Sequence, residues 1–290
     1  MKVIIFGAKG QLGNELFQIL KENYLVYGFS KEDCDVCNKK ELKKIFHNLK
    51  PDIVINAAAY TNVDEAENNF LLADKINNLA LKYISELVND FDAILIHFST
   101  DYVFNETNKI PIVESCKKKP INKYGLSKHL GEEQILNKCK KYFIFRISWV
   151  YGKYGQNFPK KIIALAKQKK VIRVINDQEG IPTSTKFIAQ TINKIISKKE
   201  YLTFFGVYNI APLGSVTWYG LALHIKSIID SKNSQIFTLK DIIPVKSEEY
   251  ITNASRPRYS CLNNIKMCDM FNIRTYDWTK YMDEYMDEIL

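Results

Sequence analysis

The sequence contains no hydrophobic run long enough to cross a membrane. A transmembrane helix needs about 20 predominantly apolar residues, and the apolar stretches in these 290 residues are much shorter. The apolar block at residues 3–6 is also too short for the central region of a signal peptide. We therefore expect a protein of the cytoplasm that has no membrane partner.

Internal repeats, low-complexity tracts, Gly/Ser linkers and a regular cysteine pattern are also missing. The six cysteines are scattered, unlike those of a disulfide-rich scaffold. They are Cys34, Cys37, Cys116, Cys139, Cys261 and Cys268. Cys34 and Cys37 form a C-x-x-C pair, but no second Cys or His pair could complete a zinc site. Reduced thiols and no bound metal are the expectation.

Acidic residues are fewer than basic ones, which gives a formal net charge of +9. A nucleic-acid-binding protein would concentrate such charge on one face or one helix. The lysines here are spread along the chain, with only short clusters at 117–119 and 167–170. We therefore interpret them as solvated surface residues and expect no nucleic-acid partner. A basic pocket for an anionic small molecule would fit the same charge.

A glycine-rich turn follows the first apolar segment. Residues 3–6 read as a buried strand, Gly7, Gly10 and Gly13 follow with the spacing G-x-x-G-x-x-G, and a helical pattern comes next. Glycines allow a tight turn and close approach of the backbone to a ligand, and free N–H groups at a helix N-terminus attract a diphosphate. The unit predicts a dinucleotide site; a purely structural turn is the alternative.

The second predicted strand, residues 25–29, indicates which dinucleotide binds. Dinucleotide enzymes often place a carboxylate at the end of this strand to bind the adenosine ribose, whereas this chain has Ser30 and Lys31 there. A lysine would attract the 2′-phosphate of NADPH. NADPH is therefore favoured, NADH remains the alternative, and Asp35 is a candidate contact on the adenine side.

The third predicted strand, residues 52–56, runs into Ala57, Ala58 and Ala59. Open α/β sheets bind their ligands at the carboxyl ends of the strands. Small side chains at this place would let a cofactor lie against the backbone. Close packing of a helix against the strand is the alternative interpretation.

The fourth predicted strand, residues 93–98, ends in a hydroxyl and a carboxylate, those of Thr100 and Asp101. They would lie at the same ligand edge of the sheet, and Thr100 is a candidate hydrogen-bond donor to a substrate carbonyl. His97 lies inside the apolar strand. It reads as a core histidine whose hydrogen bonds are satisfied within the fold.

Tyr124 and Lys128 lie in a segment from 123 to 136 that reads as a helix. Residues four apart share one helical face, so both side chains can reach one ligand. The pKa of a tyrosine is about 10, and a nearby ammonium would favour the phenolate and bring proton transfer into range. The spacing also occurs by chance on solvated helices, so its catalytic interpretation depends on the rest of the chain.

Strands and helices alternate up to about residue 150, which predicts a parallel, doubly wound α/β sheet of the Rossmann type. We expect residues 1–150 to form an NAD(P)-binding domain. Beyond it the alternation loosens, and residues 151–290 are expected to build mainly a smaller α/β substrate-binding lobe. Elements near 187–211 are expected to return to the first domain.

A series of motifs in this chain order resembles one family over residues 1 to about 265. They are Gly10-Gln11-Leu12-Gly13, residues 56–61, Ser99-Thr100-Asp101, Tyr124-x-x-x-Lys128, residues 146–152, residues 176–183 and Ala254-Ser255-Arg256-Pro257. The chain is similar to extended short-chain dehydrogenases/reductases. Within that group it closely resembles the dTDP-4-dehydrorhamnose reductase family.

That resemblance implies roles for individual residues. Tyr124 would donate a proton, Lys128 would bind the nicotinamide ribose and lower the tyrosine pKa, and Thr100 would hold the ketone oxygen. With those inferred above, the candidate cofactor contacts are Gly7, Gly10, Gln11, Leu12, Gly13, Ser30, Lys31, Asp35, Val36, Ala57, Ala58, Ala59, Thr61, Tyr124 and Lys128. The candidate substrate contacts are Thr100, Asp101, Tyr102 and Trp149.

The implied activity is NAD(P)H-dependent reduction of the C4 ketone of a nucleotide-linked 6-deoxy-4-keto sugar. The reaction that the resemblance favours is the conversion of dTDP-4-dehydro-L-rhamnose to dTDP-L-rhamnose, in the synthesis of cell-surface polysaccharide precursors. Alternatives are a reductase, epimerase or dehydratase for another nucleotide sugar, and a non-catalytic regulatory subunit that binds a nucleotide sugar. Related dehydratases tend to have a glutamate where this chain has Tyr102, and intact Thr100, Tyr124 and Lys128 argue against the non-catalytic alternative.

One position departs from the family pattern. Some members are described as dimers bridged by a metal that carboxylates hold, and one of these carboxylates falls at Glu15. The second falls at Lys186, whose charge would repel a divalent ion. We therefore expect no metal, and any homodimer is expected to form without a metal bridge.

Overall fold

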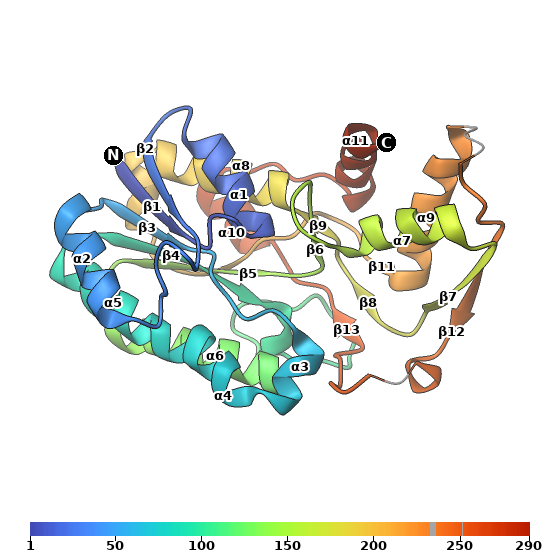
Figure 1. Cartoon of the computed structure of the whole chain (residues 1–290), viewed down its shortest axis with the longest axis horizontal. Coiled ribbons are helices and arrows are strands. Elements are labelled where there is room, and N and C mark those ends of the chain that lie inside the picture. Colours follow the sequence, from blue (N-terminus) through green and yellow to red (C-terminus); the bar gives the residue numbers. More distant parts are fainter. Residues whose placement is uncertain (233–235, 251) are drawn as a thin grey trace.

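The computed structural model of the chain describes residues 1–232, 236–250 and 252–290. Its centre is a parallel sheet with the strand order β10-β5-β4-β3-β1-β2 (Figure 1). The strands are β1 (Lys2–Phe6), β2 (Leu25–Phe29), β3 (Ile53–Asn56), β4 (Ile94–Thr100), β5 (Tyr142–Ile147) and β10 (Gly206–Asn209). These strands are apolar on both faces, as parallel strands covered by helices on both sides must be.

Helices cover both faces of this sheet (Figure 1). Alternate side chains of a strand point to opposite faces, so Val3 and Ile5 pack on one helical layer and Ile4 and Phe6 on the other. The first layer contains α1 (Gln11–Leu20), α8 (Thr185–Ser197) and α10 (Ile265–Phe271). The second contains α2 (Lys39–Leu49), α5 (Ala80–Asp90) and α6 (Lys123–Lys138). The predicted fold class, a doubly wound α/β sheet, is confirmed.

The chain between β3 and α5 is helical but interrupted. It forms α3 (Val63–Asn68), α4 (Phe70–Asp74) and a π-helical turn, η1 (Lys75–Leu79). The π-helical turn therefore joins α4 directly to α5 (Ala80–Asp90). In this turn Asn77 donates to the Ser127 hydroxyl at 2.9 Å, and its carbonyl lies so close to Gly131 that a Cβ there would be 2.0 Å away. The turn thereby fixes the position of α6.

A second, smaller lobe lies beside the sheet (Figure 1). Its own core contains Ile162, Leu221, Ile225 and Ile242. The lobe is built from α7 (Phe158–Gln168), α9 (Trp218–Ser231), β7 (Val171–Ile175) and β12 (Asp241–Val245), with the short strands β8 (Glu179–Gly180), β11 (Val216–Thr217) and β13 (Tyr259–Ser260). The remaining elements are β6 (Val150–Tyr151), β9 (Thr183–Ser184), η2 (Asp101–Val103), η3 (Lys199–Thr203), η4 (Ser247–Glu249) and α11 (Trp278–Ile289).

The strand order indicates where on the sheet a ligand would bind. The chain goes from β1 outward to β2, then returns past β1 to β3 and continues in the opposite direction. In such sheets the crevice at the carboxyl ends of the strands on either side of this reversal binds the ligand. Gly7 follows β1 and Ala57 follows β3, so the predicted dinucleotide turn and the alanines meet at that crevice.

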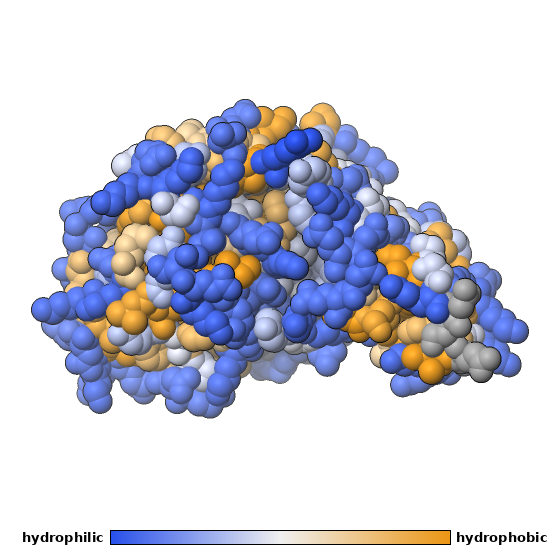
Figure 2. Space-filling view, turned by 90° about the horizontal axis from the view of Figure 1, so that it is seen from above, coloured by the Kyte–Doolittle hydropathy of each residue, from blue (hydrophilic) through white to orange (hydrophobic). Residues whose placement is uncertain are grey.

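The face of the molecule shown in Figure 2 is mainly hydrophilic. In the face shown in Figure 2, hydrophobic residues form scattered patches between polar ones. None of the helices built from the described residues combines the length and the hydrophobicity needed to span a bilayer.

Candidate active site

Two adjoining hollows follow the carboxyl edge of the sheet and share Gly10, Ala57, Ala58 and Ala59. Their volumes are about 330 and 600 Å³, within the range of about 300–1,000 Å³ that is usual for small-molecule sites. We call the smaller one the adenosine-side hollow and the larger one the catalytic hollow. Together they make one groove in which the cofactor candidates and the catalytic candidates lie.

The glycine turn leaves room for a diphosphate. Gly7 has a φ of 79°, and a Cβ there would lie 2.6 Å from the Ala58 nitrogen. Gly10 caps α1 without any side-chain hydrogen bond, so the N–H groups of the first helical turn remain available for an anion. The Gln11 side chain is engaged elsewhere, donating to the Val150 carbonyl at 3.2 Å, which leaves its backbone for a ligand. The residues present therefore fit a dinucleotide diphosphate.

Gly13 does not line either hollow, in contrast to the prediction that it contacts the cofactor. It is buried under the turn, and a Cβ at this position would lie 2.1 Å from the Gly7 carbonyl oxygen. Its role is to let α1 pack against the turn that Gly7 begins.

Four predicted adenosine-side residues line the smaller hollow: Ser30, Lys31, Asp35 and Val36. The Ser30 hydroxyl donates to Asp33 at 2.6 Å, so it is already engaged within its own loop. The sequence interpretation missed two charged residues that line this hollow, Lys9 and Glu32, which form an exposed ion pair at 3.4 Å.

Glu32 modifies the argument about the 2′-phosphate. The preference for NADPH was inferred from Ser30 and Lys31 at the end of the strand, but Glu32 lines the same hollow as Lys31. Its charge is partly neutralised by Lys9. The nearby Ser30 hydroxyl and the Lys9 ammonium hold the pKa of Glu32 below its usual range. Two lysines, Lys9 and Lys31, and two carboxylates, those of Glu32 and Asp35, therefore line this end of the groove.

Tyr124 and Lys128 both line the catalytic hollow, as do Leu12 and Thr61. The helix that carries the pair begins at Asn122, whose side chain accepts from the Gly125 N–H at 2.7 Å. A Cβ at Gly125 would lie 2.2 Å from the Tyr102 carbonyl oxygen. The N-terminal turn of α6 can therefore approach the end of β4 only because residue 125 is glycine.

The pKa of Tyr124 is raised above its usual value, mainly by burial; contact with the Thr100 hydroxyl lowers it, and the Asp101 charge raises it further. The sequence interpretation had Lys128 lowering this pKa. In the structure the Lys128 ammonium instead donates to the Phe98 carbonyl at 2.6 Å. The Tyr124 hydroxyl is therefore protonated at neutral pH, the state that a proton donor needs, but its raised pKa makes it a weaker acid than one with a pKa near the working pH.

Lys128 is 2% exposed. Burial lowers its pKa to about 8, and the Glu132 charge opposes this shift. Its Nζ lies 3.3 Å from His97 Nε2. His97 was predicted to be a satisfied core histidine; it is buried and hydrogen-bonded as predicted, but its partner is the candidate catalytic lysine.

Thr100 and Asp101 close the hollow at the end of β4. The Thr100 hydroxyl donates to Asp101 Oδ1 at 2.9 Å. Burial raises the pKa of Asp101 to about 6, and the nearby Ser260 and Thr100 side chains oppose this shift. Within hydrogen-bond distance and angle, its Oδ2 has no partner among the described residues. An unpartnered buried acceptor suits a hydroxyl group of a ligand. Tyr102 packs edge-on against Tyr124, with the ring centroids 5.8 Å apart.

Two stacked tryptophans form a wall of the catalytic hollow. The rings of Trp149 and Trp218 are parallel within 6°, with centroids 3.4 Å apart. Trp149 has a φ of 45°, and Gly180 lies so close beneath it that a Cβ would be 2.4 Å from the indole. Trp149 was predicted at this site, whereas Trp218 was missed because it begins an ordinary helical segment with no motif.

An ion pair links the two halves of the chain beyond this wall. Arg256 donates to Asp64 at 2.6 Å, which joins α3 to the loop at 253–258. Both residues line a further hollow that also includes Trp218. The sequence interpretation included Arg256 in a family motif without assigning it a role.

The comparisons with known proteins agree with this geometry. A family model described as "RmlD substrate binding domain" matches residues 1–290. The dTDP-4-dehydrorhamnose reductase of Salmonella typhimurium is 36% identical over 287 residues, which cover 96% of this chain and 94% of that protein. The chain belongs to the dTDP-4-dehydrorhamnose reductase family. The resemblance inferred from the motifs is confirmed.

Other known proteins are similar to this chain in sequence or in structure. Spore coat polysaccharide biosynthesis protein SpsK of Bacillus subtilis is 36% identical, covering 99% of this chain and 97% of that protein. The crystal structure of dTDP-4-dehydrorhamnose reductase from Bacillus anthracis in complex with NADP has a TM-score of 0.92 at 35% identity, covering 99% of both chains. A dTDP-glucose 4,6-dehydratase at 17% identity, with a TM-score of 0.80, shows the fold alone.

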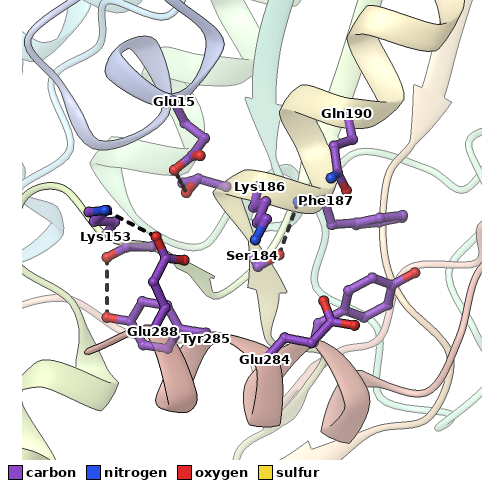
Figure 3. Close-up of a pocket in the computed structure, with 12 residues that line it drawn as sticks. Glu15, Lys153, Ser184, Lys186, Phe187, Gln190, Glu284, Tyr285 and Glu288 are labelled. Carbon is purple, nitrogen blue, oxygen red and sulfur yellow. Dashed lines mark hydrogen bonds and ion pairs between the residues drawn. The ribbon is translucent and has the colours of Figure 1, made fainter. Parts of the chain in front are cut away.

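The departure from the family pattern lies in a separate hollow on the α1 and α8 side. Figure 3 shows Glu15 of α1 and Lys186 of α8 at this hollow, with Glu284 and Glu288 of α11 across it. Glu15 accepts from the Thr185 hydroxyl at 3.1 Å. Among the described residues, no group of three or more His, Cys, Asp or Glu side chains is arranged to hold a metal. The absence of a metal bridge stays a prediction.

Proposed function

We propose that this chain reduces the C4 ketone of a dTDP-linked 6-deoxy-4-keto sugar, with dTDP-4-dehydro-L-rhamnose as substrate and dTDP-L-rhamnose as product. Family membership supports the reaction class. The single observation that carries the proposal is the meeting of Thr100, Tyr124 and Lys128 in the same hollow as the glycine turn. A hydroxyl donor, a proton donor and a buried cation are what ketone reduction requires beside a dinucleotide.

The proposed cofactor is NADPH. When bound, its nicotinamide supplies the hydride. The first turn of α1 would hold the diphosphate through the N–H groups of Gln11 and Leu12. Lys31 and Lys9 would attract the 2′-phosphate, and the small alanines 57–59 would let the dinucleotide lie along the crevice. The negative charge of Glu32 would weaken the attraction of the 2′-phosphate, so NADH stays the alternative.

Tyr124 would protonate the ketone oxygen as it gains charge. Its raised pKa keeps the proton on the hydroxyl until the oxygen becomes basic. Thr100 would hold the same oxygen by a hydrogen bond and so orient the carbonyl. Lys128 would bind the nicotinamide ribose with the part of its ammonium that faces the hollow.

The sugar would lie between Asp101 and Trp149, where the unpartnered Oδ2 could accept from a sugar hydroxyl. The nucleotide end would continue past Trp218 into the next hollow. That hollow offers aromatic surface and cations from Phe158, Trp218, Lys161, Arg173 and Arg256. Aromatic rings stack on a base, and the cations suit a diphosphate.

Three further proposals concern the whole chain. Residues 1–150 with the returning segment near 187–211 would bind the cofactor, and the remainder of 151–290 would mainly form the lobe that binds the sugar. A homodimer, where it forms, would need no metal because Lys186 lies near Glu15. The proposed compartment is the cytoplasm, and the six free cysteines fit a reducing environment.

A substrate panel tests the proposal. The purified chain is given NADPH and 4-keto sugars linked to dTDP, GDP, CDP or UDP, and NADPH oxidation is followed with product NMR. We expect net oxidation that is fastest with the dTDP sugar, and a product carrying a new C4 hydroxyl. Conversion of the 4-keto sugar without net NADPH consumption would instead indicate an epimerase or a dehydratase. Binding without any conversion would indicate the non-catalytic alternative.

A further inference from the structure

His97 and Asn56 form a polar pair on an otherwise apolar face of the sheet. The two residues lie opposite each other in the β3–β4 register, and both point to the α6 side together with Val54 and Leu95. His97 is 1% exposed and Asn56 2%. Buried polar groups on such a face are costly unless they are paired, so a specific partner must account for them.

The partner is Lys128. Its Nζ carries three protons and no lone pair. One proton goes to the Phe98 carbonyl at 2.6 Å and a second to His97 Nε2 at 3.3 Å. The third remains for the catalytic hollow, which Lys128 lines. Two fixed acceptors on the sheet therefore decide where the third proton points.

This arrangement determines the tautomer of His97. Because an ammonium only donates, Nε2 must accept and carries no proton. The neutral ring then has its proton on Nδ1. The Asn56 atom that lies 3.2 Å from Nδ1 is the amide nitrogen Nδ2, which cannot accept this proton. Asn56 Oδ1 is otherwise without a partner among the described residues, so turning the amide to bring Oδ1 to Nδ1 satisfies this acceptor.

We propose that the Asn56–His97 pair is a positioning device that holds the Lys128 ammonium charged and aimed at the nicotinamide ribose. The proposal rests on the function proposed above and adds a residue that acts through Lys128. Burial and the Lys128 charge hold the pKa of His97 well below its usual value, so the ring stays a neutral acceptor over the working pH range.

The charged groups around the pair are few. Glu132 of α6 raises the Lys128 pKa, and Arg146 of β5 neutralises Glu132 through a direct ion pair. Asp101 at the end of β4 acts on Tyr124. The element on the remaining side, β3, contributes only the uncharged Asn56. His97 is thus the uncharged acceptor that stabilises the Lys128 ammonium from the sheet side.

Three variants separate positioning from packing. His97→Gln keeps a hydrogen-bond acceptor near the position of Nε2, and His97→Met removes that acceptor at similar side-chain size. The control, His129→Met, makes the same substitution on α6, the helix of Lys128, at a histidine that lies beside Glu133. In His97→Met we expect kcat to fall about 10- to 100-fold, the effect of losing one hydrogen bond to a charged group. In a plot of kcat against pH, the fall in kcat on the basic side should occur about one to two pH units lower than in the wild type.

His97→Gln should recover most of the rate and the wild-type limb, and His129→Met should stay within about twofold of wild type. Equal losses in the Gln and Met variants, or an unmoved basic limb in His97→Met, would overturn the proposal. NADPH affinity and thermal unfolding show whether each variant is folded.

A readout without substrate keeps this test apart from the proposed function. The chain has only four histidines, so ¹⁵N-histidine NMR of the wild-type protein with NADP can report on each ring. We expect His97 to show a protonated Nδ1 and a bare Nε2 that do not titrate near neutral pH. A proton on Nε2, or a charged ring near pH 7, would refute the arrangement. Failure of wild type to reduce any 4-keto sugar would refute only the proposed function.

Discussion

Glu132→Gln should be among the most destabilising single substitutions in the nucleotide-binding half. Glu132 and Arg146 form a bidentate pair at 2.9 and 2.8 Å, and their side chains are 0% and 2% exposed. Removing one partner leaves the guanidinium buried without a counter-charge, which costs about 3–5 kcal/mol. For a protein of this size that loss lowers the melting temperature by about 6–20 °C.

The neighbouring residue provides the control. Glu133 pairs with Lys118, but its side chain is 39% exposed, so Glu133→Gln should cost less than about 1 kcal/mol. Urea unfolding of both variants at pH 7 measures the difference. Similar free energies of unfolding for the two variants would refute the claim that the Glu132–Arg146 pair anchors α6 to the sheet.

The pH dependence of this effect has a definite sign. Burial raises the pKa of Glu132, but the hydrogen bond and the charge of Arg146 outweigh it, and the net pKa lies below the usual 4.5. A lowered folded pKa gives stability that is fully present above the unfolded value and is lost as pH falls through the folded one. The difference in free energy of unfolding between wild type and Glu132→Gln should be constant from pH 6 to 8 and should become smaller below about pH 4.

Three further outcomes follow from the groove and its surroundings. Lys31→Ala should weaken NADPH binding roughly tenfold and leave NADH binding unchanged, because a charge contact to the 2′-phosphate is lost. A fluorescence titration measures both affinities, and equal losses for NADPH and NADH would contradict this role of Lys31. Asp101 has a pKa of about 6, so the KM for the sugar should rise as pH falls below 6, and Asp101→Asn should remove this dependence. Chelation by EDTA should leave the mass from light scattering unchanged, and dissociation would show that a metal bridge exists despite Lys186.

Much of the nucleotide-binding half could be predicted because its signals are local. Continuous apolar segments such as residues 3–6 and 53–55 mark strands buried on both faces, and the glycine spacing after the first strand marks the turn. The second lobe was less predictable. Its strands β8, β11 and β13 have two residues each, which is too few to show an alternation of apolar and polar side chains. Strands that pair with one another are also separated in the sequence by more than one loop.

The site residues that motifs carry were foreseen, and those defined by contacts between distant segments were not. Arg256 and Asp64 are 192 positions apart, and neither gives a local sign of the other. His97 lies in an apolar strand, so its position favoured a core role; only the register with Asn56 and the reach of Lys128 reveal its partner. Trp218 became part of the site because its ring stacks on Trp149.

Comparison of Tyr124→Phe with wild type tests the central claim most directly. Turnover of the dTDP-linked 4-keto sugar is measured by NADPH oxidation, together with the Kd for NADPH. Removing only the phenolic hydroxyl should lower kcat by about 10²–10⁴-fold, the usual contribution of a positioned acid, while the Kd for NADPH stays within a few-fold. Near-wild-type turnover in the variant would contradict the assignment of Tyr124 as the proton donor.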